Sequence, residues 1–542
     1  MTDMSQCTPS NAMSSFLEAG KWKLIPFETA QLTGTLAWAA QESNAPELRL
    51  PLKASGRYHI FVGCANLSGL GGYPLVKLSN DVAFTPLRRA AGDVEEVYFR
   101  TADLTAADQL VIAQRHKGTP EPAGVAWVRL TEAGPLDDAY TSQPLARHGV
   151  TGTIDGYTLF YERGLSTESE LLEEIEPLRG TNLDTIILQS GGSGTTNFES
   201  RVTSDQLLMP RAVYPRAGDR IALEAIHELI SHQVNPTSVL IKGAHNAGIR
   251  VLSGLRTGAW EYTEPFSDTM TSTFYRSHPE WHAIDRSGAA VSRMSYAVPE
   301  VRTYLVNMMR ELVQQGSDGA CLLFHRGPPF TGYEKPFLEF AKSKYGVDPL
   351  QAAPDDPRVL AARTECITNL MREMRTMLDE LAAARQKHLT LAAITLSKES
   401  DNESNGIDIT SLMKAHLLDE IYPDAFGSST AVRDYITSIT GLATPLGITV
   451  RPMNQHWNWS VPTADQLCRD ASSIYSSGAD GLCFWDIDLC KDSYLRQIAL
   501  RLGDPKIAKT WASTSPSARR TYKFIRLGNY RNDLGIRQGG GF

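Results

Sequence analysis

The stretch GSDGACLLF at residues 316–324 recurs as GADGLCFWD at residues 478–486. In each copy a Gly-x-Asp-Gly turn follows a helical pattern and leads into an apolar run, which predicts a strand. We assign the two runs as the fourth and eighth strands of a repeating strand–helix unit, a spacing that suits the two halves of a barrel. The alternative is that Gly-x-Asp-Gly is only favourable turn chemistry, and it places a strand at both positions too.

The region after Pro135 alternates strand-like and helical patterns. Its helices carry apolar residues at i, i+3 and i+4, whereas its strands are nearly continuous apolar runs, as in strands buried on both faces. Eight strands are predicted: Tyr157–Tyr161, Thr185–Gln189, Arg250–Gly254, Ala320–Phe324, Leu389–Leu396, Leu418–Tyr422, Ile448–Met453 and Gly481–Asp486. They predict an α/β fold, a (β/α)₈ TIM barrel over residues 146–503 with long loops.

The region before the barrel has a different period. Residues 20–140 contain short strand-like runs separated by Gly, Pro, Asn and Asp, with no long helical pattern between them. This is typical of an antiparallel β-sandwich of the jelly-roll type. Residues 1–19 are expected to be an N-terminal tail. Residues 504–542 are expected to form a strand, which is a candidate to complete a sheet of the N-terminal domain, and a tail.

Composition narrows the classes of partner. The 542-residue chain is 42% hydrophobic and 21% charged, with a formal net charge of −8. Its acidic and basic residues are interspersed, whereas a nucleic-acid-binding protein concentrates Lys and Arg on one face. No window reaches the ~18 consecutive apolar residues of a membrane span. We therefore expect neither a nucleic-acid nor a membrane partner.

The compartment is inferred from the N-terminus and the cysteines. Residues 1–20 contain no basic segment followed by an apolar one, unlike a secretory signal. The seven cysteines are scattered without C-x-x-C or zinc-type spacing, as expected for buried free thiols in a reducing compartment. We expect a cytoplasmic protein, and a secreted form whose signal peptide has been removed is the alternative. A homo-oligomer is expected only from the size class of the enzyme.

Polar and aromatic side chains follow nearly every predicted barrel strand. Because (β/α)₈ enzymes carry their sites at the C-terminal ends of the strands, these residues should line one rim. Sugar rings stack on Trp and Tyr, and their hydroxyls bind carboxylates, amides and guanidinium groups, so this rim suits a carbohydrate. The predicted substrate-binding residues are Glu162, Arg163, Trp260, Glu261, His325, Arg326, Asn454, His456, Trp457, Trp485 and Asp488.

Glycoside hydrolysis requires two carboxyl groups on either side of the scissile bond. Asp486 is the first candidate because it stands at the tip of the eighth strand. Its predicted partners are Glu420 or Asp424 at the sixth strand and Glu399 after the fifth. For each carboxylate the alternative is a structural ion pair or a helix cap.

Two further features bear on the ligand. Arg326, beside His325, could bind an anionic sugar group bidentately or instead brace the barrel mouth in an ion pair. The twelve histidines include no His-x-His or His-Glu-x-x-His pair, so we expect no metal, and we expect no cofactor.

Several motifs resemble those of the poorly characterised bacterial glycoside-hydrolase-like (β/α)₈ barrel proteins. They are HPEW at residues 278–281, SYAVPEVR at 295–302, DG at 318–319, HRGPP at 325–329 and GADG leading into FWD at 478–486. The resemblance spans about residues 150–500. It implies a (β/α)₈ barrel and an activity on glycans, without specifying a substrate.

The sequence departs from the large retaining clan of (β/α)₈ glycosidases. That clan places an acid/base Glu after strand four and a nucleophile Glu after strand seven, where this chain has His325-Arg326 and Asn454-Gln455-His456. The standard pair therefore cannot be transferred. We predict a glycoside hydrolase that uses two other carboxylates. The alternatives are a non-catalytic glycan-binding protein and another sugar-processing enzyme, a lyase or isomerase, on the same barrel.

Overall fold

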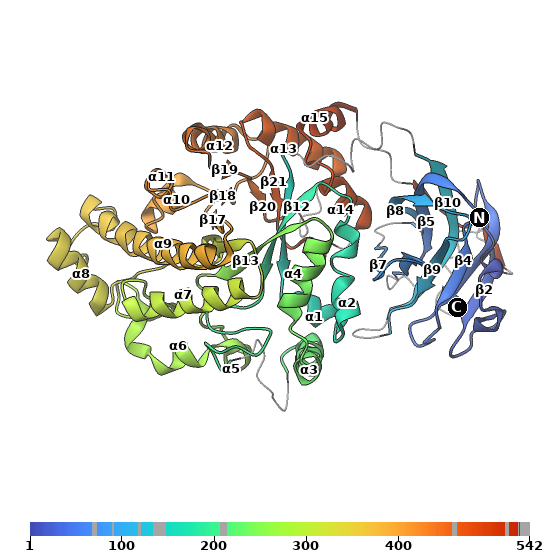
Figure 1. Cartoon of the computed structure of the whole chain (residues 1–542), viewed down its shortest axis with the longest axis horizontal. Helices are drawn as coiled ribbons and strands as arrows, with labels where there is room; N and C mark the ends of the chain where they lie inside the picture. Colours follow the sequence, from blue (N-terminus) through green and yellow to red (C-terminus); the bar gives the residue numbers. More distant parts are fainter. Residues whose placement is uncertain are drawn as a thin grey trace.

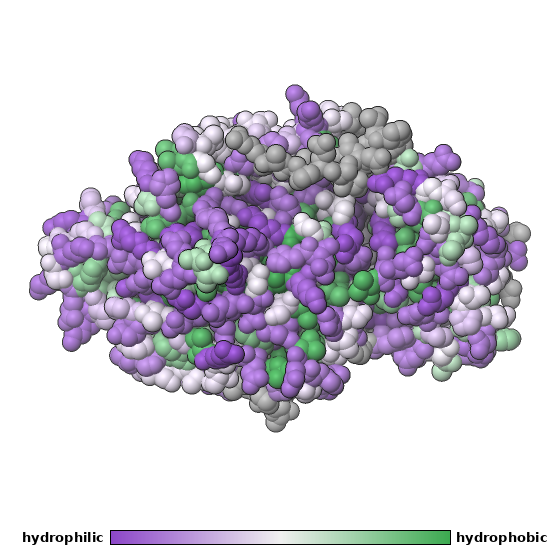
Figure 2. Space-filling view, viewed as in Figure 1, coloured by the Kyte–Doolittle hydropathy of each residue, from purple (hydrophilic) through white to green (hydrophobic). Residues whose placement is uncertain are grey.

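The computed structural model describes residues 1–67, 73–88, 92–116, 121–133, 148–205, 214–457, 463–490, 492–514, 520–528 and 530–531. Figure 1 shows a larger part built of strands and helices beside a smaller part built mainly of strands. Figure 2 shows that most of the viewed face is hydrophilic, with hydrophobic residues in small separate patches. No helix of the described residues is long and apolar enough to cross a membrane.

A curled parallel sheet forms the centre of the larger part. Its strands are β11 (Val150–Asp155), β12 (Leu183–Gln189), β13 (Arg250–Arg256), β16 (Gly319–Leu323), β17 (Thr390–Thr395), β18 (Glu420–Pro423), β19 (Thr449–Val450), β20 (Met453–Asn454) and β21 (Leu482–Phe484). They pair in the order β19-β18-β17-β16-β13-β12-β11-β21-β20. The predicted α/β class with a parallel sheet is confirmed.

The interior of the curled sheet is filled by side chains rather than open. One hydrophobic cluster is formed by side chains from Trp485, which follows β21, and from seven strands: β12, β13, β16, β17, β18, β20 and β21. It contains Ile187, Leu252, Cys321, Leu323, Ala392, Ile394, Tyr422, Met453, Cys483 and Trp485. Because Trp485, beyond the end of β21, is a member of this cluster, the core reaches the C-terminal ends of the strands.

Helices surround the sheet, and some of them pack on other helices rather than on the strands (Figure 1). They are α1 (Thr158–Arg163), α2 (Glu168–Leu172), α3 (Ala217–Ser231), α4 (Pro236–Asn246), α5 (Ser267–Met270), α6 (Thr273–Ser277), α7 (Pro299–Gln314), α8 (Lys335–Tyr345), α9 (Pro357–Arg385), α10 (Glu399–Ser404), α11 (Ile409–Lys414), α12 (Thr430–Ala443), α13 (Ala464–Ser476), α14 (Ser493–Ala499) and α15 (Pro505–Thr514). A hairpin, β14 (His282–Ile284) and β15 (Ala290–Met294), interrupts the loop after β13.

Helix α7 illustrates why these segments are helical. Pro299 opens it, and Val301, Leu305 and Leu312 lie fully buried on one face. Each such side chain contributes about 1.5–3 kcal/mol when it leaves water. The helical period of the apolar residues therefore selects the face that packs on the sheet.

The first predicted strand is wrong. Residues Tyr157–Tyr161 lie in and just before helix α1, and the strand is β11, which ends at Asp155. Asp155-Gly156 forms the turn between them, and Leu159 and Phe160 are buried as one face of a helix. The run was too short for its period to distinguish a strand from a helix. The other seven predicted strands each overlap an observed one.

Two mainly antiparallel sheets form the smaller part. The first pairs β22 (Arg520–Tyr522), β8 (Val94–Leu104), β5 (Gly56–Ala65), β10 (Ala123–Glu132), β3 (Thr33–Ala39), β2 (Trp22–Glu28), β23 (Arg526–Leu527) and β24 (Tyr530–Arg531) in that order, with β1 (Met13–Ser14) beside β2. The second pairs β4 (Leu48–Pro51), β9 (Gln109–Ala113), β6 (Leu75–Leu78) and β7 (Thr85–Pro86). All of the described strand pairs in these sheets are antiparallel except β1 with β2, which is parallel. One hydrophobic cluster contains residues of both sheets.

The C-terminal strand pairs with the N-terminal part as expected, whereas the N-terminal residues do not form the expected tail. The C-terminal strands β22 and β23 pair with β8 and β2 of the N-terminal part. Residues 532–542, expected to be a tail, lie outside the described residues. Residues 1–19 are not a simple tail, because Met4, Cys7 and Ala12 are buried in the hydrophobic core. All seven cysteines are buried and free.

The two parts are joined by polar contacts. The backbone N–H of Arg88 donates to Ser493 Oγ at 2.7 Å, and the backbone N–H of Ser493 donates to the backbone oxygen of Arg88 at 2.9 Å. The guanidinium of Arg100 lies 3.5 Å from the carboxylate of Glu176. The smaller part thus packs beside α14 and the start of the larger part.

Candidate active site

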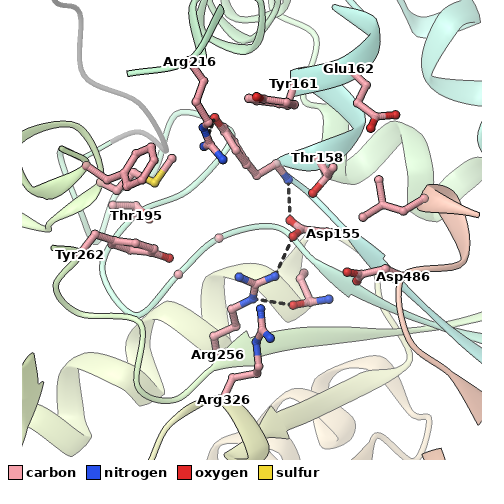
Figure 3. Close-up of a pocket in the computed structure, with 17 residues that line it drawn as sticks. Asp155, Thr158, Tyr161, Glu162, Thr195, Arg216, Arg256, Tyr262, Arg326 and Asp486 are labelled. Atoms are coloured by element: carbon pink, nitrogen blue, oxygen red, sulfur yellow. Dashed lines mark hydrogen bonds and ion pairs between the residues drawn. The ribbon is translucent and has the colours of Figure 1, made fainter. Parts of the chain in front are cut away.

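A cavity of ≈ 550 Å³ opens at the C-terminal ends of the strands (Figure 3). Its residues come from the ends of β11, β12 and β13, from helices α1 and α5, from the segments after β16 and β21, and from the loops after β12 and β13. They are Asp155, Tyr157, Thr158, Tyr161, Glu162, Gln189, Gly191, Gly192, Thr195, Arg216, Arg256, Tyr262, Phe266, Met270, Arg326, Asp486 and Leu489.

Asp155 is held in place from both sides. Arg256 Nη2 lies 2.7 Å from one carboxylate oxygen, and the backbone N–H of Tyr157 donates to the other at 2.9 Å. Arg256 Nε also donates to Gln189 Oε1 at 2.8 Å. Burial raises the pKa of Asp155, but Arg256 and the hydrogen bonds from Tyr157 and Thr158 outweigh it, so the pKa lies below its ordinary value. Asp155 is therefore ionised at neutral pH.

Asp486 lies in the same cavity in a different environment. It follows β21 with φ 47° and ψ 61°, a left-handed conformation, and its side chain is 3% exposed. Its backbone N–H donates to Thr153 Oγ1 at 2.7 Å, and that hydroxyl donates to Asp486 Oδ1 at 3.2 Å. Burial, reinforced by the charge of Asp155, raises the pKa of Asp486 to about 7, although Arg256 and Arg326 oppose this rise.

The rim of the cavity is aromatic and cationic. The guanidinium of Arg216 lies 4.7 Å from the ring centre of Tyr161 and 4.6 Å from that of Phe266. Asp219 pairs with Arg216 at 2.8 Å and also accepts a hydrogen bond from the hydroxyl of Tyr157. These contacts fix a wall of aromatic faces, which suits the C–H faces of a sugar ring.

Some sequence-predicted residues meet at this cavity. Asp486, Glu162 and Arg326 line it. Trp485 contacts one of these lining residues: the guanidinium of Arg326 lies 5.5 Å from its ring centre, and the His325 ring centre lies 4.7 Å away.

Three other predicted residues lie close to the cavity without lining it. Asp424 follows β18, and burial, opposed by Arg326, raises its pKa to about 7. Asp488 is buried in the turn beyond Asp486, and burial raises its pKa well above the ordinary value. Arg163 is buried beside it and donates to its backbone oxygen at 3.0 Å.

Other predicted residues lie elsewhere. Glu399 is exposed at the start of α10. Trp260 is buried against Phe274 and Tyr304, and Glu261 accepts a hydrogen bond of 2.9 Å from Tyr275. The remaining three lie at and after the end of β20. Asn454, the last residue of β20, is partly buried, His456 is exposed, and Trp457 is buried and donates to the backbone oxygen of Trp485 at 2.7 Å.

Glu420 requires a correction, because it lies at the opposite end of the sheet. It is the first residue of β18, and its carboxylate pairs with Arg250, the first residue of β13, at 2.5 Å. The structure therefore does not bring Glu420 to Asp486. Its observed role is the structural ion pair that the sequence left open as an alternative.

The Glu420–Arg250 pair gives a prediction about stability. Glu420→Gln is expected to lower the free energy of unfolding by about 1–3 kcal/mol, because it leaves a partly buried guanidinium without its carboxylate. Chemical denaturation would measure the loss, with the exposed Glu339→Gln on α8 as the control, expected to change it by less than about 0.5 kcal/mol. A variant of full stability that has lost activity would contradict this assignment.

Sequence reasoning missed Asp155, Tyr157, Thr158 and Arg216. The signal for Asp155 was present: a run rich in β-branched residues, VTGTI at 150–154, followed by the Asp-Gly turn. Arg216 follows a long loop without periodicity, and no local pattern places it. Among the described residues, no group of three or more His, Cys, Asp or Glu is arranged to hold a metal ion.

No protein-family model matches this chain, and no curated protein does. Similar solved structures include the catalytic domain of a psychrophilic chitinase B from Arthrobacter TAD20, 11% identical over 70% of this chain and 98% of that chain, with a TM-score of 0.37. The catalytic domain of a β-amylase from Paenibacillus polymyxa is 11% identical over 68% and 99%, with a TM-score of 0.40. An α-galactosidase from Thermus thermophilus is 12% identical over 89% and 95%, with a TM-score of 0.34. At such low similarity, the function must be argued from the cavity itself.

Proposed function

We propose that this protein is a glycoside hydrolase in which Asp486 donates a proton and Asp155 acts as the ionised carboxylate. One observation carries the proposal: two carboxyl groups share one cavity, and their environments move their pKa values apart. Pairs of acids separated in this way are the arrangement that acid/base chemistry requires near pH 7.

The different protonation states of Asp486 and Asp155 assign each carboxyl group a separate step in the reaction. Protonated Asp486 gives its proton to the glycosidic oxygen as the C–O bond breaks. Ionised Asp155 either attacks the anomeric carbon or takes a proton from the attacking water, and the two routes retain or invert the anomeric configuration. Arg256 and Gln189 orient Asp155 in both routes.

The walls of the cavity support a carbohydrate substrate. Tyr161, Tyr262 and Phe266 offer ring faces, while Glu162 and Thr195 offer hydrogen-bonding groups. The volume of ≈ 550 Å³ is in the range of small-molecule sites. This mixture of aromatic faces and a few polar groups is what binding of sugar rings requires.

The proposed fold is a complete (β/α)₈ barrel over residues 146–503, preceded by a β-sandwich over residues 20–140. Strands β19 and β20 are separated only by Arg451 and Pro452, so they count as one strand that pairs with β18 on one side and β21 on the other. The hydrophobic cluster inside the curled sheet also supports the barrel. The cluster shared by the two sheets of the smaller part supports the sandwich.

The pH dependence tests the assignment of the acid. Because Asp486 has a raised pKa of about 7 and must be protonated, kcat/KM should be constant below pH 7 and fall about tenfold per pH unit above it. The lowered pKa of Asp155 should keep the acidic limb well below pH 5. Asp424 also has a pKa of about 7, so Asp424→Asn is the control and should leave the alkaline limb in place. A limb that disappears in this variant would assign the proton donor to Asp424.

Turnover of a defined substrate decides the function. Purified wild type should release aryl alcohol from at least one member of a panel of α- and β-linked aryl glycosides of neutral and acidic sugars. The double variant Asp155→Asn/Asp486→Asn controls for contaminating hydrolases and should be inactive. Glycan binding without turnover would favour a non-catalytic binding protein, and unsaturated or isomerised products would favour a lyase or isomerase.

A further inference from the structure

Three guanidinium groups line the cavity, and two of them are neutralised. Arg216 pairs with Asp219 at 2.8 Å, and Arg256 pairs with Asp155 at 2.7 Å. The third, Arg326, has no hydrogen bond or ion pair with any described residue. Its guanidinium instead makes a cation–π contact with Trp485, whose ring centre lies 5.5 Å away.

The acids that act on Arg326 are either already paired or only partly ionised. Asp155 and Asp486 both interact with its charge, and Asp155 is paired with Arg256 at 2.7 Å. Burial raises the pKa of Asp486, and of Asp424, which also interacts with Arg326, to about 7, so each is only partly ionised at neutral pH. Partial burial and the charge of Arg256 lower the pKa of Arg326, and the charges of Asp486 and Asp155 oppose this shift. Arg326 is exposed and lines the cavity, so its guanidinium can bind an anionic ligand without giving up an existing ion pair.

A second polar group in the cavity also lacks a partner. Gln189 is 2% exposed, and its Nε2 makes no hydrogen bond with the described residues. Arg256 Nε donates to Gln189 Oε1 at 2.8 Å, so the amide cannot turn over without losing that contact. The amide therefore presents a fixed donor at the wall formed by the end of β12.

We propose that the substrate carries a carboxylate, as a hexuronic acid residue does, and that Arg326 binds it while Gln189 Nε2 donates to the same sugar. A single negative charge matches the one uncompensated guanidinium. A planar carboxylate also matches the guanidinium fork, which binds it bidentately. This inference rests on the proposed glycosidase function and names its substrate class.

The first test needs no variant. Wild-type kcat/KM for aryl glucuronides and galacturonides should exceed that for the matched glucosides, galactosides and uronide methyl esters by about 10- to 100-fold. Arg326→Gln should reduce this preference by the same factor, and Arg326→Lys should recover part of it, because Lys keeps the charge but not the fork. Arg433→Gln, at an exposed position on α12, is the matched control and should keep the preference.

Three results would overturn the inference. Equal turnover of uronides and neutral glycosides would do so while leaving the glycosidase proposal intact. A marked preference for sugar 6-sulfates or 6-phosphates over uronides would replace the carboxylate by another anion. A large fall in the melting temperature of ligand-free Arg326→Gln, with neutral and acidic substrates equally affected, would make Arg326 a structural brace.

Measurement of sugar binding tests carboxylate recognition even if the protein hydrolyses no glycoside. If wild type turns over no glycoside, the glycosidase proposal fails, and calorimetric titration with methyl glucuronide and methyl glucoside then decides. Tighter binding of the uronide that Arg326→Gln abolishes would sustain carboxylate recognition. Equal or undetectable binding of both sugars would overturn it.

Discussion

Asp155→Asn is expected to lower kcat by about 10³-fold or more, because an amide can neither attack the anomeric carbon nor accept a proton from water. The amide oxygen can still accept the hydrogen bond from Arg256, so the cavity should keep its shape. The ion pair itself is lost, and we expect a decrease of about 1–3 kcal/mol in the free energy of unfolding.

The same variant carries a second, independent readout. The charge of Asp155 contributes to the raised pKa of Asp486. Its removal should therefore move the alkaline limb of the residual activity to a pH below that of wild type. Steady-state kinetics across pH measures both effects at once.

A matched control separates chemistry from charge. Asp379→Asn removes an exposed carboxylate on α9 that pairs with Arg375, and it should change neither kcat nor the alkaline limb. Restoration of Asp155→Asn turnover by azide, with a glycosyl azide product, would identify Asp155 as a nucleophile. Wild-type turnover by Asp155→Asn would contradict the proposed pair.

The order of strands was predictable because burial on both faces leaves continuous apolar runs. Residues 185–189 and 320–324 show this pattern, and both are strands. The first strand was not predicted because β11 lacks a continuous apolar run: it contains Thr151 and Thr153. Both side chains are buried, and Thr153 is hydrogen-bonded to Asp486. A polar inward face hid the strand and, with it, the carboxylate at its tip.

To locate the site, the exact end of each strand had to be known, and not only that a strand was present. The sixth strand was found, yet Glu420 begins it and Asp424 follows its end, so the two carboxylates lie at opposite ends of the sheet. Boundaries are the least certain part of a sequence prediction, and a few residues along a strand move a side chain by about 3.3 Å each. The partner of Asp486 therefore could not be chosen from the sequence.

The electrostatics could not be predicted either. Asp155 and Asp486 are identical in chemistry, and their different pKa values depend on Arg256, a residue about 100 positions from one and 230 from the other. Only the folded arrangement places this cation in contact with Asp155.

Asp486→Asn is expected to show a loss that depends on the leaving group. Natural oligosaccharides and aryl glycosides with basic leaving groups need a proton at the glycosidic oxygen, so their kcat/KM should fall by about 10²–10⁴-fold. A dinitrophenyl glycoside of the same sugar leaves as a stable anion without protonation, and its turnover should fall far less. The alkaline limb near pH 7 should disappear as well, since the group with a pKa of about 7 has been removed. A loss of equal size for every leaving group, with the limb retained, would show that Asp486 positions the substrate and that the proton comes from another acid.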